Sequence, residues 1–301
     1  MDEIDIDLIL QLAKNSRISY HELADRIGLS VNSVHKRIKT MLDTGIIHSF
    51  TANMSWTVMK PVIILIFGRS ETRSMKDTIE KLGKSKHIFK VVIAGGNYLY
   101  VHGMLRTLSE LDGFSSFVKK EGMMPDTTLG IGHIPPEADL EGPDLSKLDY
   151  RIIHALHRDS RKATSDVAEE LDVSSRTVRR RLFRMQEDNS IRLTIEFVPT
   201  ASSDIITIMH LTTKSMADRT EIINLLINEY RPNMIGTAQL SNLPELIICT
   251  LWTKTMKELK NIQDNLWNEG VFENIIPNIF YDLYEFDSWM DDHLRKKAGA
   301  E

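Results

Sequence analysis

Two short segments of the chain gather the side chains best suited to recognise nucleic acid. Residues 30–42 hold asparagine, histidine and lysine at helical spacing, and residues 174–186 hold five arginines in the same arrangement. Asparagine can pair with adenine and arginine with guanine through two hydrogen bonds, while lysine, serine and threonine can hold phosphate groups. Both segments are therefore predicted to contact double-stranded DNA.

The candidate contacts are the side chains opposite the apolar stripe when each segment is placed on a helix. The candidates are Asn32, Ser33, His35, Lys36, Lys39 and Thr40 in the first segment and Arg176, Thr177, Arg179, Arg180 and Arg184 in the second. Arg37 and Arg181 lie closer to the stripe, where packing or a phosphate contact is expected instead of base reading. A solvated helix face would explain an isolated basic helix equally well, so the surrounding elements decide.

Those elements predict a winged helix-turn-helix. In the first segment's surroundings, apolar residues recur at helical spacing over 8–13 and 23–27, Ser19 and Glu22 have the form of a capping box, and Gly28 breaks the helical pattern. Gly45 ends the third helix, and the β-prone residues 46–51 follow as the first strand of a wing. The third helix of such a motif can enter the major groove.

The motif is part of an internal repeat. Shifting the sequence by 144 residues aligns residues 5–47 with residues 149–191 without a gap. The identical pairs include Asp5/Asp149, Ser16/Ser160, Arg17/Arg161, Val34/Val178, Arg37/Arg181 and Met41/Met185. Residues 135–143 lie between the copies, and their prolines and glycine predict a linker.

Each helix-turn-helix is followed by a pattern of strand, helix, two strands, helix and strand. The predicted elements are residues 62–67, 75–82, 89–94, 99–104, 108–118 and 127–134 in the first copy and 205–211, 222–230, 234–239, 246–252, 256–267 and 271–280 in the second. This order is the ferredoxin-like βαββαβ plan.

The predicted fold class is α+β, with two winged helix-turn-helix domains alternating with two ferredoxin-like domains. The expected boundaries are 1–56 and 144–201 for the helix-turn-helix domains, 57–134 and 202–285 for the ferredoxin-like domains, 135–143 for the linker and 286–301 for a C-terminal helix or tail. Residues 62–67 contain no polar position, which predicts that both faces of their sheet are covered. An intramolecular pseudo-dimer of the two halves would supply that cover, and a homo-oligomer is the alternative.

Composition favours a folded cytoplasmic protein. The net charge is −5, and the excess of acid is concentrated in residues 202–301, where 15 acidic residues face 9 basic ones. A basic surface elsewhere remains compatible with this balance. The single cysteine, Cys249, excludes a disulfide framework within the chain, and neither a basic, apolar signal peptide nor an apolar run of membrane-spanning length occurs. No membrane partner is expected.

Residues 27–38, continuing to the Gly-Ile-Ile of residues 45–47, resemble the helix-turn-helix signature of the Lrp/AsnC regulators, also called feast/famine proteins. The βαββαβ domain with a glycine-rich turn in its central hairpin is similar to their ligand-sensing domain, which is related to ACT modules. The resemblance applies to both copies of the repeat, which together make up most of the chain. It implies sequence-specific DNA binding modulated by an amino acid or related metabolite, with the sensing domains paired through their sheets.

The glycine-rich turn is the candidate effector site. It comprises Gly95, Gly96, Asn97 and Tyr98. Because glycine has no side chain, a ligand could approach the backbone amides there. A tight hairpin with positive φ explains the glycines equally well. Leu99 departs from the family, which usually has an acidic residue after the tyrosine. The second copy has a longer turn over residues 240–245 that includes Pro244, so unequal ligand sites are predicted.

No catalytic site, metal site or cofactor is predicted. The chain has no phosphate-binding loop, nucleophile elbow or zinc-binding pattern, and His154 and His157 have no third ligand at suitable spacing. One enzymatic alternative shares the architecture, because sirohaem decarboxylases resemble paired Lrp/AsnC proteins. They would need a basic cleft for an anionic tetrapyrrole, and His87, Lys90 and His102 could supply part of one. A protein-interaction scaffold with a degenerate helix-turn-helix is the third alternative.

Overall fold

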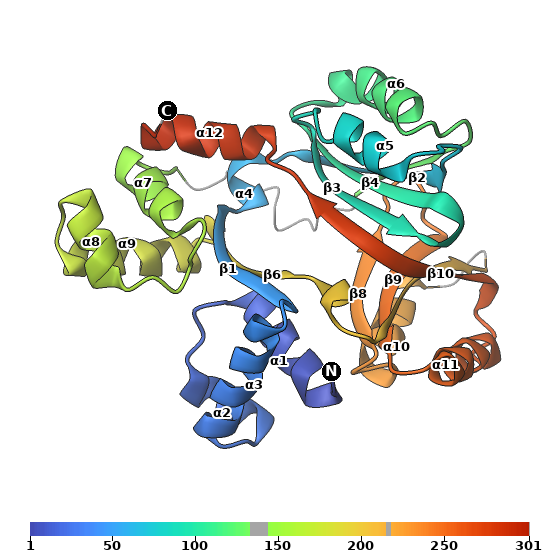
Figure 1. The fold of residues 1–301 in the computed structure, drawn as a ribbon, viewed down its shortest axis with the longest axis horizontal. Coiled ribbons are helices and arrows are strands. Elements are labelled where there is room, and N and C mark those ends of the chain that lie inside the picture. The colour runs from blue at the N-terminus through green and yellow to red at the C-terminus, as the bar shows by residue number, and fades with distance from the viewer. Residues whose placement is uncertain (133–143, 215–217, 301) are drawn as a thin grey trace. The chain divides into compact units, whose positions relative to one another are not determined.

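A computed structural model of the chain describes residues 1–132, 144–214 and 218–300 (Figure 1). The predicted linker, 135–143, and the last two residues of the predicted strand 127–134 lie outside the described residues. The chain forms two compact units, and each unit contains parts of both copies of the repeat. The helix-turn-helix unit comprises the described residues of 1–60, 135–202 and 289–301, and the sheet unit those of 61–134 and 203–288.

The first copy contributes three helices, a strand and a short helix to the helix-turn-helix unit. They are α1 (Glu3–Lys14), α2 (Tyr20–Ile27), α3 (Val31–Asp43), β1 (Ile47–Met54) and α4 (Trp56–Met59). Helix α2 ends at Gly28, whose φ of 75° is left-handed, and Ser30 caps α3 by accepting a hydrogen bond from the Ser33 amide. The predicted capping box at α2 is half formed, because Ser19 caps the helix while the Glu22 carboxylate pairs with Arg26.

The second copy repeats this arrangement. Its elements are α7 (Lys147–Leu156), α8 (Thr164–Leu171), α9 (Ser175–Glu187), β6 (Ile191–Phe197) and the 3₁₀ turn η4 (Pro199–Ala201). A further helix, α12 (Trp289–Ala298), packs against α7, where the rings of His293 and Tyr150 meet edge to face. The first copy has no counterpart of this helix among the described residues, so the unit is not fully symmetric.

The wing strands of the two copies pair with each other as a two-stranded antiparallel sheet, β1–β6. The contacts between the copies are reciprocal. Arg17 donates to the carbonyl of Ser160 and Arg161 donates to the carbonyl of Ser16, while the two serine hydroxyls share a buried hydrogen bond of 2.5 Å. Such self-complementary contacts are those of a two-fold dimer. The helix-turn-helix unit is therefore an intramolecular pseudo-dimer.

The first copy contributes a ferredoxin-like set of elements to the sheet unit. They are β2 (Val62–Arg69), α5 (Met75–Leu82), β3 (Ile88–Ala94), the turn η1 (Gly95–Asn97), β4 (Tyr98–Leu105), the turn η2 (Leu108–Glu110), α6 (Leu111–Glu121) and β5 (Thr128–Ile131). In Figure 1, α5 and α6 lie together on one side of strands β2, β3 and β4. A core that includes Ile64, Ile66, Val91 and Phe114 fills the space between them.

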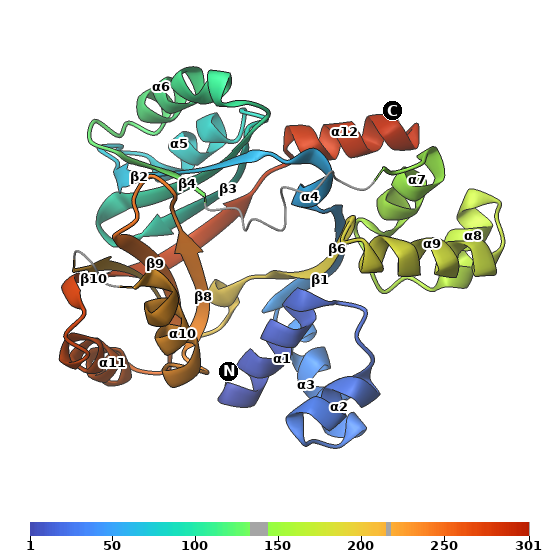
Figure 2. The same ribbon diagram turned by 180° about the vertical axis from the view of Figure 1, so that it is seen from behind.

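The second copy follows the same order, with one strand longer than predicted. Its elements are β7 (Ile205–Thr213), α10 (Arg219–Glu229), β8 (Met234–Gln239), β9 (Leu246–Thr253), α11 (Met256–Asn268) and β10 (Phe272–Glu285). Figure 2 shows α10 and α11 on the same side of these strands. The strand predicted to end at residue 280 continues to residue 285, because residues 280–285 pair with β3 of the first copy.

This pairing joins the two halves into one eight-stranded sheet, ordered β5-β2-β4-β3-β10-β7-β9-β8. At the outer edges, Gly132 and Leu240 form a bridge that brings β5 and the end of β8 together. A core built from both copies, including Leu65, Phe67 and Ile248, lies on the sheet face away from the helices. The prediction that both faces of β2 are covered is thus confirmed, and the cover comes from the other half of the same chain.

Candidate nucleic-acid interface

Helix α3 holds all six predicted residues of the first copy at its surface. Asn32, Ser33, His35, Lys36, Lys39 and Thr40 are exposed. Their face points away from the core because Val34, Ile38 and Met41 bury the opposite stripe. The hydroxyls of Ser33 and Thr40 already hydrogen-bond within the helix, to Ser30 and to the carbonyl of Lys36. The amide and basic side chains are therefore the groups most available to a ligand.

Helix α9 presents a more basic face. Arg176, Arg179 and Arg180 are exposed, and none of the three has an ion-pair partner among the described residues. Thr177 is half-buried, and its hydroxyl shares a hydrogen bond with the N-cap residue Ser174. Three guanidinium groups on one helix face form a strong attractive surface for phosphate and for guanine.

Arg184, the fifth candidate of α9, is held differently. Its Nη2 donates to the carboxylate of Asp149 at 2.7 Å, and Asp149 is fully buried. Arg181 approaches the same carboxylate at 3.4 Å. In the first copy, Arg37 pairs with Asp5 at 2.7 Å and with Asp2 at 2.8 Å. Packing or a phosphate contact, instead of base reading, was expected for Arg37 and Arg181, and both pair with carboxylates of the fold. Arg184, predicted to contact DNA, is paired in the same way.

Phe183 is a member of the α9 face that sequence reasoning missed. Its exposed fraction is 65%, the largest among the exposed large apolar side chains described. It occupies the position that Lys39 holds in α3, 144 residues earlier. The signal was present in the sequence, since an aromatic residue interrupts an arginine face on the side opposite the buried stripe of Val178, Leu182 and Met185.

The predicted effector turn forms η1 between strands β3 and β4. Gly96 has φ 69° and Asn97 has φ 59°, so the glycine does serve the backbone conformation of a tight hairpin. Gly96 and Asn97 are exposed, and Gly95 and Tyr98 are half-buried. Of the four predicted residues, Tyr98 lines a cavity, whereas Gly95, Gly96 and Asn97 are not among its lining residues.

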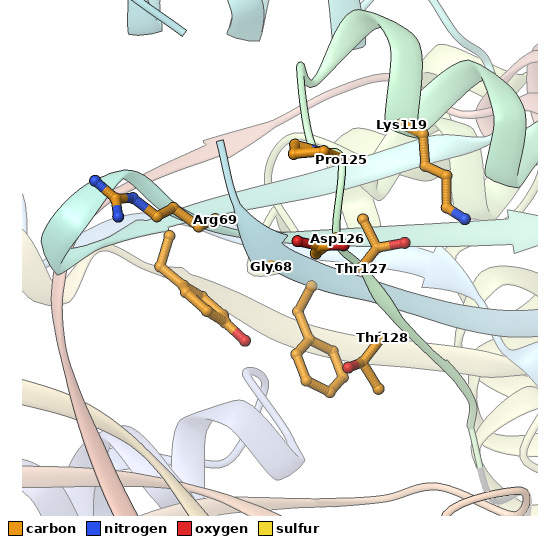
Figure 3. A pocket seen from close by; sticks show the side chains of 9 residues that line it. Gly68, Arg69, Lys119, Pro125, Asp126, Thr127 and Thr128 are labelled. Carbon is orange, nitrogen blue, oxygen red and sulfur yellow. The ribbon is translucent and has the colours of Figure 1, made fainter. Parts of the chain in front are cut away.

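That cavity is an open hollow of about 510 Å³ in the sheet unit. It is lined by Phe67, Gly68, Arg69, Tyr98, Lys119, Pro125, Asp126, Thr127 and Thr128. Figure 3 shows the side chains of Arg69, Lys119 and Asp126 around it, drawn from β2, α6 and the loop before β5. Two cationic groups, one carboxylate and two threonine hydroxyls can bind a small ligand that carries both charges.

The corresponding turn of the second copy is occupied by structural contacts. The side chain of Asn242 accepts a hydrogen bond from the Ile131 amide and donates to the carbonyl of Leu129, and the Ser241 amide donates to the carbonyl of Ile131. Leu240 packs so closely on Gly130 that a Cβ there would lie 2.4 Å from it. This turn therefore holds the β5 edge of the first copy.

The basic residues considered for a tetrapyrrole do not converge. His87 lies on the helix side of the sheet, where its ring meets that of Phe114. Lys90 and His102 are cross-strand partners on the opposite face, and Lys90 pairs with Glu285 at 3.5 Å. Burial lowers the pKa of His102 to about 3, so its ring is neutral at physiological pH. The described residues contain no group of histidine, cysteine and acidic side chains arranged to hold a metal ion.

Comparison with known proteins agrees with this geometry. A family of winged helix-turn-helix DNA-binding domains matches residues 1–48, and the AsnC-type helix-turn-helix domain matches residues 145–186. An uncharacterised HTH-type transcriptional regulator of Pyrococcus furiosus is 24% identical over 116 residues, which are 38% of this chain and 78% of that protein. Another from Pyrococcus abyssi is 28% identical over 99 residues, 33% of this chain and 67% of that protein. The chain is therefore similar to Lrp/AsnC-type regulators in both copies of its repeat.

The chain also shares its whole architecture with a solved structure. The crystal structure of the siroheme decarboxylase NirDL matches with a TM-score of 0.62 and 11% identity, over 98% of this chain and 99% of that one. At this identity the likeness shows the fold alone. Across the described residues of the chain, no helix is both long and apolar enough to cross a membrane. The molecule is a DNA-binding transcription regulator in which both copies of the repeat occur on one chain.

Proposed function

We propose that this regulator recognises a specific double-stranded site as a single chain, with α3 and α9 as its two recognition helices. The observation that carries the proposal is the pair of exposed faces, Asn32, His35, Lys36 and Lys39 on one helix and Arg176, Arg179 and Arg180 on the other. The pseudo-dimer joined through β1 and β6 supplies the two-fold arrangement that helix-turn-helix dimers use for half-sites about 34–36 Å apart. Arg184 adds a paired charge at the edge of the face.

A mobility-shift assay of the full chain against genomic fragments tests this function. We expect a subset of fragments to bind at least about a thousandfold more tightly than random duplex, the usual margin of specific binding. The affinity should fall steeply as salt rises from 50 to 200 mM, because cations released from the phosphates drive binding. The proposal would be contradicted if all fragments bound with equal affinity, or if the affinity did not change with salt.

We further infer that a small zwitterionic effector, of which an amino acid is the simplest example, binds in the cavity beside Tyr98. Arg69 would receive a carboxylate and Asp126 an ammonium group, while Lys119, on the other side of the hollow in Figure 3, adds positive charge. The inference is supported by the charges of the cavity and by the family's amino-acid sensing. The second copy's turn, held against β5 by Asn242, leaves one such site per chain.

Calorimetric titration with single amino acids checks the effector site. We expect one ligand per chain, and Arg69→Ala should weaken its binding by about tenfold or more, because a charge-assisted hydrogen bond is lost. The exposed Arg73→Ala serves as a matched control outside the cavity lining and should leave the affinity unchanged. Two equivalent sites per chain, or the same loss in both variants, would rule out this placement.

We infer that the regulator is not an enzyme. The separation of His87 from Lys90 and His102 by the sheet supports this inference, because a tetrapyrrole cleft would need these side chains on one side. Absorbance titration with iron uroporphyrin provides the test. A saturable shift of its Soret band at one equivalent per chain would favour the decarboxylase-like alternative, whereas an unchanged band supports the regulator alone.

A further inference from the structure

The two recognition helices present different chemistry at matched positions. Equivalent residues lie 144 apart, which pairs Asn32 with Arg176, His35 with Arg179, Lys36 with Arg180 and Lys39 with Phe183. The helices themselves have the same length and the same N-cap, with Ser30 and Ser174 each accepting from the third residue beyond. The length and the N-cap of the helix are therefore the same in both copies, whereas the exposed side chains that would contact a ligand differ.

Phe183 is the sharpest of these differences. At about 100° per residue it points in a direction between those of Arg179 and Arg180, one turn further along α9 and away from the buried stripe. Exposing an aromatic ring to water is unfavourable, and 65% of this side chain is exposed. Arg176, Arg179 and Arg180 lie on the N-terminal side of the ring, and the exposed Glu187 lies one turn beyond it. A partner that covers this face must therefore be anionic opposite the arginines and must offer an apolar group to the ring.

Duplex DNA meets both requirements. Its phosphates complement the three arginines, and the C5-methyl group of thymine is the one apolar group exposed in the major groove. An apolar protein partner would fit the ring but would bury the guanidinium groups without counter-charges, which is costly. The charge around Phe183 thus selects DNA as the occupant.

We propose that Phe183 contacts a thymine methyl group in the half-site bound by α9, and that the chain reads two different half-sites in one fixed orientation. The proposal rests on DNA recognition by α3 and α9 and adds the base that one residue selects. A homodimer presents identical helices and so favours a palindrome. This chain presents Phe183 and three arginines once only, which favours an asymmetric operator.

The experiment begins with sites selected by the full chain from random-sequence DNA. Each thymine of the selected α9 half-site is then replaced by deoxyuridine, which removes only the methyl group. For the wild-type chain, one such replacement should weaken binding about fourfold, the effect of burying one methyl group. For Phe183→Ala that replacement should change the affinity by less than a factor of about 1.5, so the two changes should be coupled.

Lys39→Ala is the matched control, because it alters the equivalent position of α3. It should keep the fourfold deoxyuridine effect in the α9 half-site. Palindromes built from two α3 half-sites or from two α9 half-sites should each bind at least about tenfold more weakly than the selected site, since several base pairs then mismatch one helix. Thermal unfolding and size-exclusion chromatography of Phe183→Ala should match the wild type, because the ring is exposed.

The outcomes separate this proposal from the function on which it rests. A chain that selects no sequence refutes sequence-specific binding itself. A chain that selects a palindrome, or whose deoxyuridine effects are the same with and without Phe183, binds DNA but overturns the present inference. A third outcome would be that the wild-type chain forms an oligomer that Phe183→Ala loses, while the deoxyuridine effects are the same in both proteins. That outcome would also overturn the inference and would assign the ring to a protein contact.

Discussion

The double substitution Arg176→Ala and Arg180→Ala is expected to weaken specific DNA binding about a hundredfold. Both side chains are exposed and unpaired among the described residues, so the loss should come from the complex and not from the fold. An arginine that reads guanine contributes about 1–3 kcal/mol, and one that holds phosphate also adds to the salt dependence. Footprinting titrations at several salt concentrations measure both effects.

The control for this prediction removes the same charge elsewhere. Lys76 and Lys84 are exposed residues of the sheet unit, and Lys76→Ala with Lys84→Ala should change the affinity less than about twofold. If the arginine variant loses affinity and its slope against salt falls by about two, both residues contact phosphate; an unchanged slope assigns them to bases. Unchanged footprints in the arginine variant would refute the role of α9.

The repeat allowed much of the fold to be predicted. Apolar periodicity gave α5 as residues 75–82 and β8 as residues 234–239, which are their observed bounds. Helix α5 buries one stripe, which includes Ile79 and Leu82, against its own domain, so the local apolar period is enough to predict it. The exposed positions of α3 followed in the same way, because the buried Val34, Ile38 and Met41 define the opposite side.

The features that were missed depend on partners distant in sequence. Strand β10 continues to Glu285 only because β3 of the other copy offers an edge there, and no local pattern marks where cross-copy pairing ends. Arg184 was assigned to DNA because a helical projection cannot show that α7 places the carboxylate of Asp149 beside it. Phe183 is not predicted, because hydrogen-bonding and charged side chains mark a DNA contact in the sequence, whereas an apolar side chain at such a position carries no such mark.

Substitution of Asp149 by alanine is expected to destabilise the helix-turn-helix unit by about 3 kcal/mol. Its buried carboxylate accepts hydrogen bonds from Arg184 at 2.7 Å and from the Ser146 hydroxyl at 2.6 Å, and it also faces Arg181. It further closes the capping box that begins α7. Removing one partner of a buried ion pair costs about 3–5 kcal/mol, and the partial exposure of both arginines favours the lower end. Thermal unfolding followed by circular dichroism measures the loss.

The equivalent substitution in the first copy provides the comparison. Asp5 is 17% exposed, and its partner Arg37 keeps a second carboxylate, Asp2, at 2.8 Å. Asp5→Ala should therefore cost only about 1 kcal/mol, the value of an ordinary hydrogen bond. Because both aspartates are the third residue of their helix and both close a capping box, the difference reports burial and the second arginine more than the cap. Equal destabilisation by the two variants would show that the Asp149 cluster is no more than a helix cap, and that Arg184 remains available to DNA.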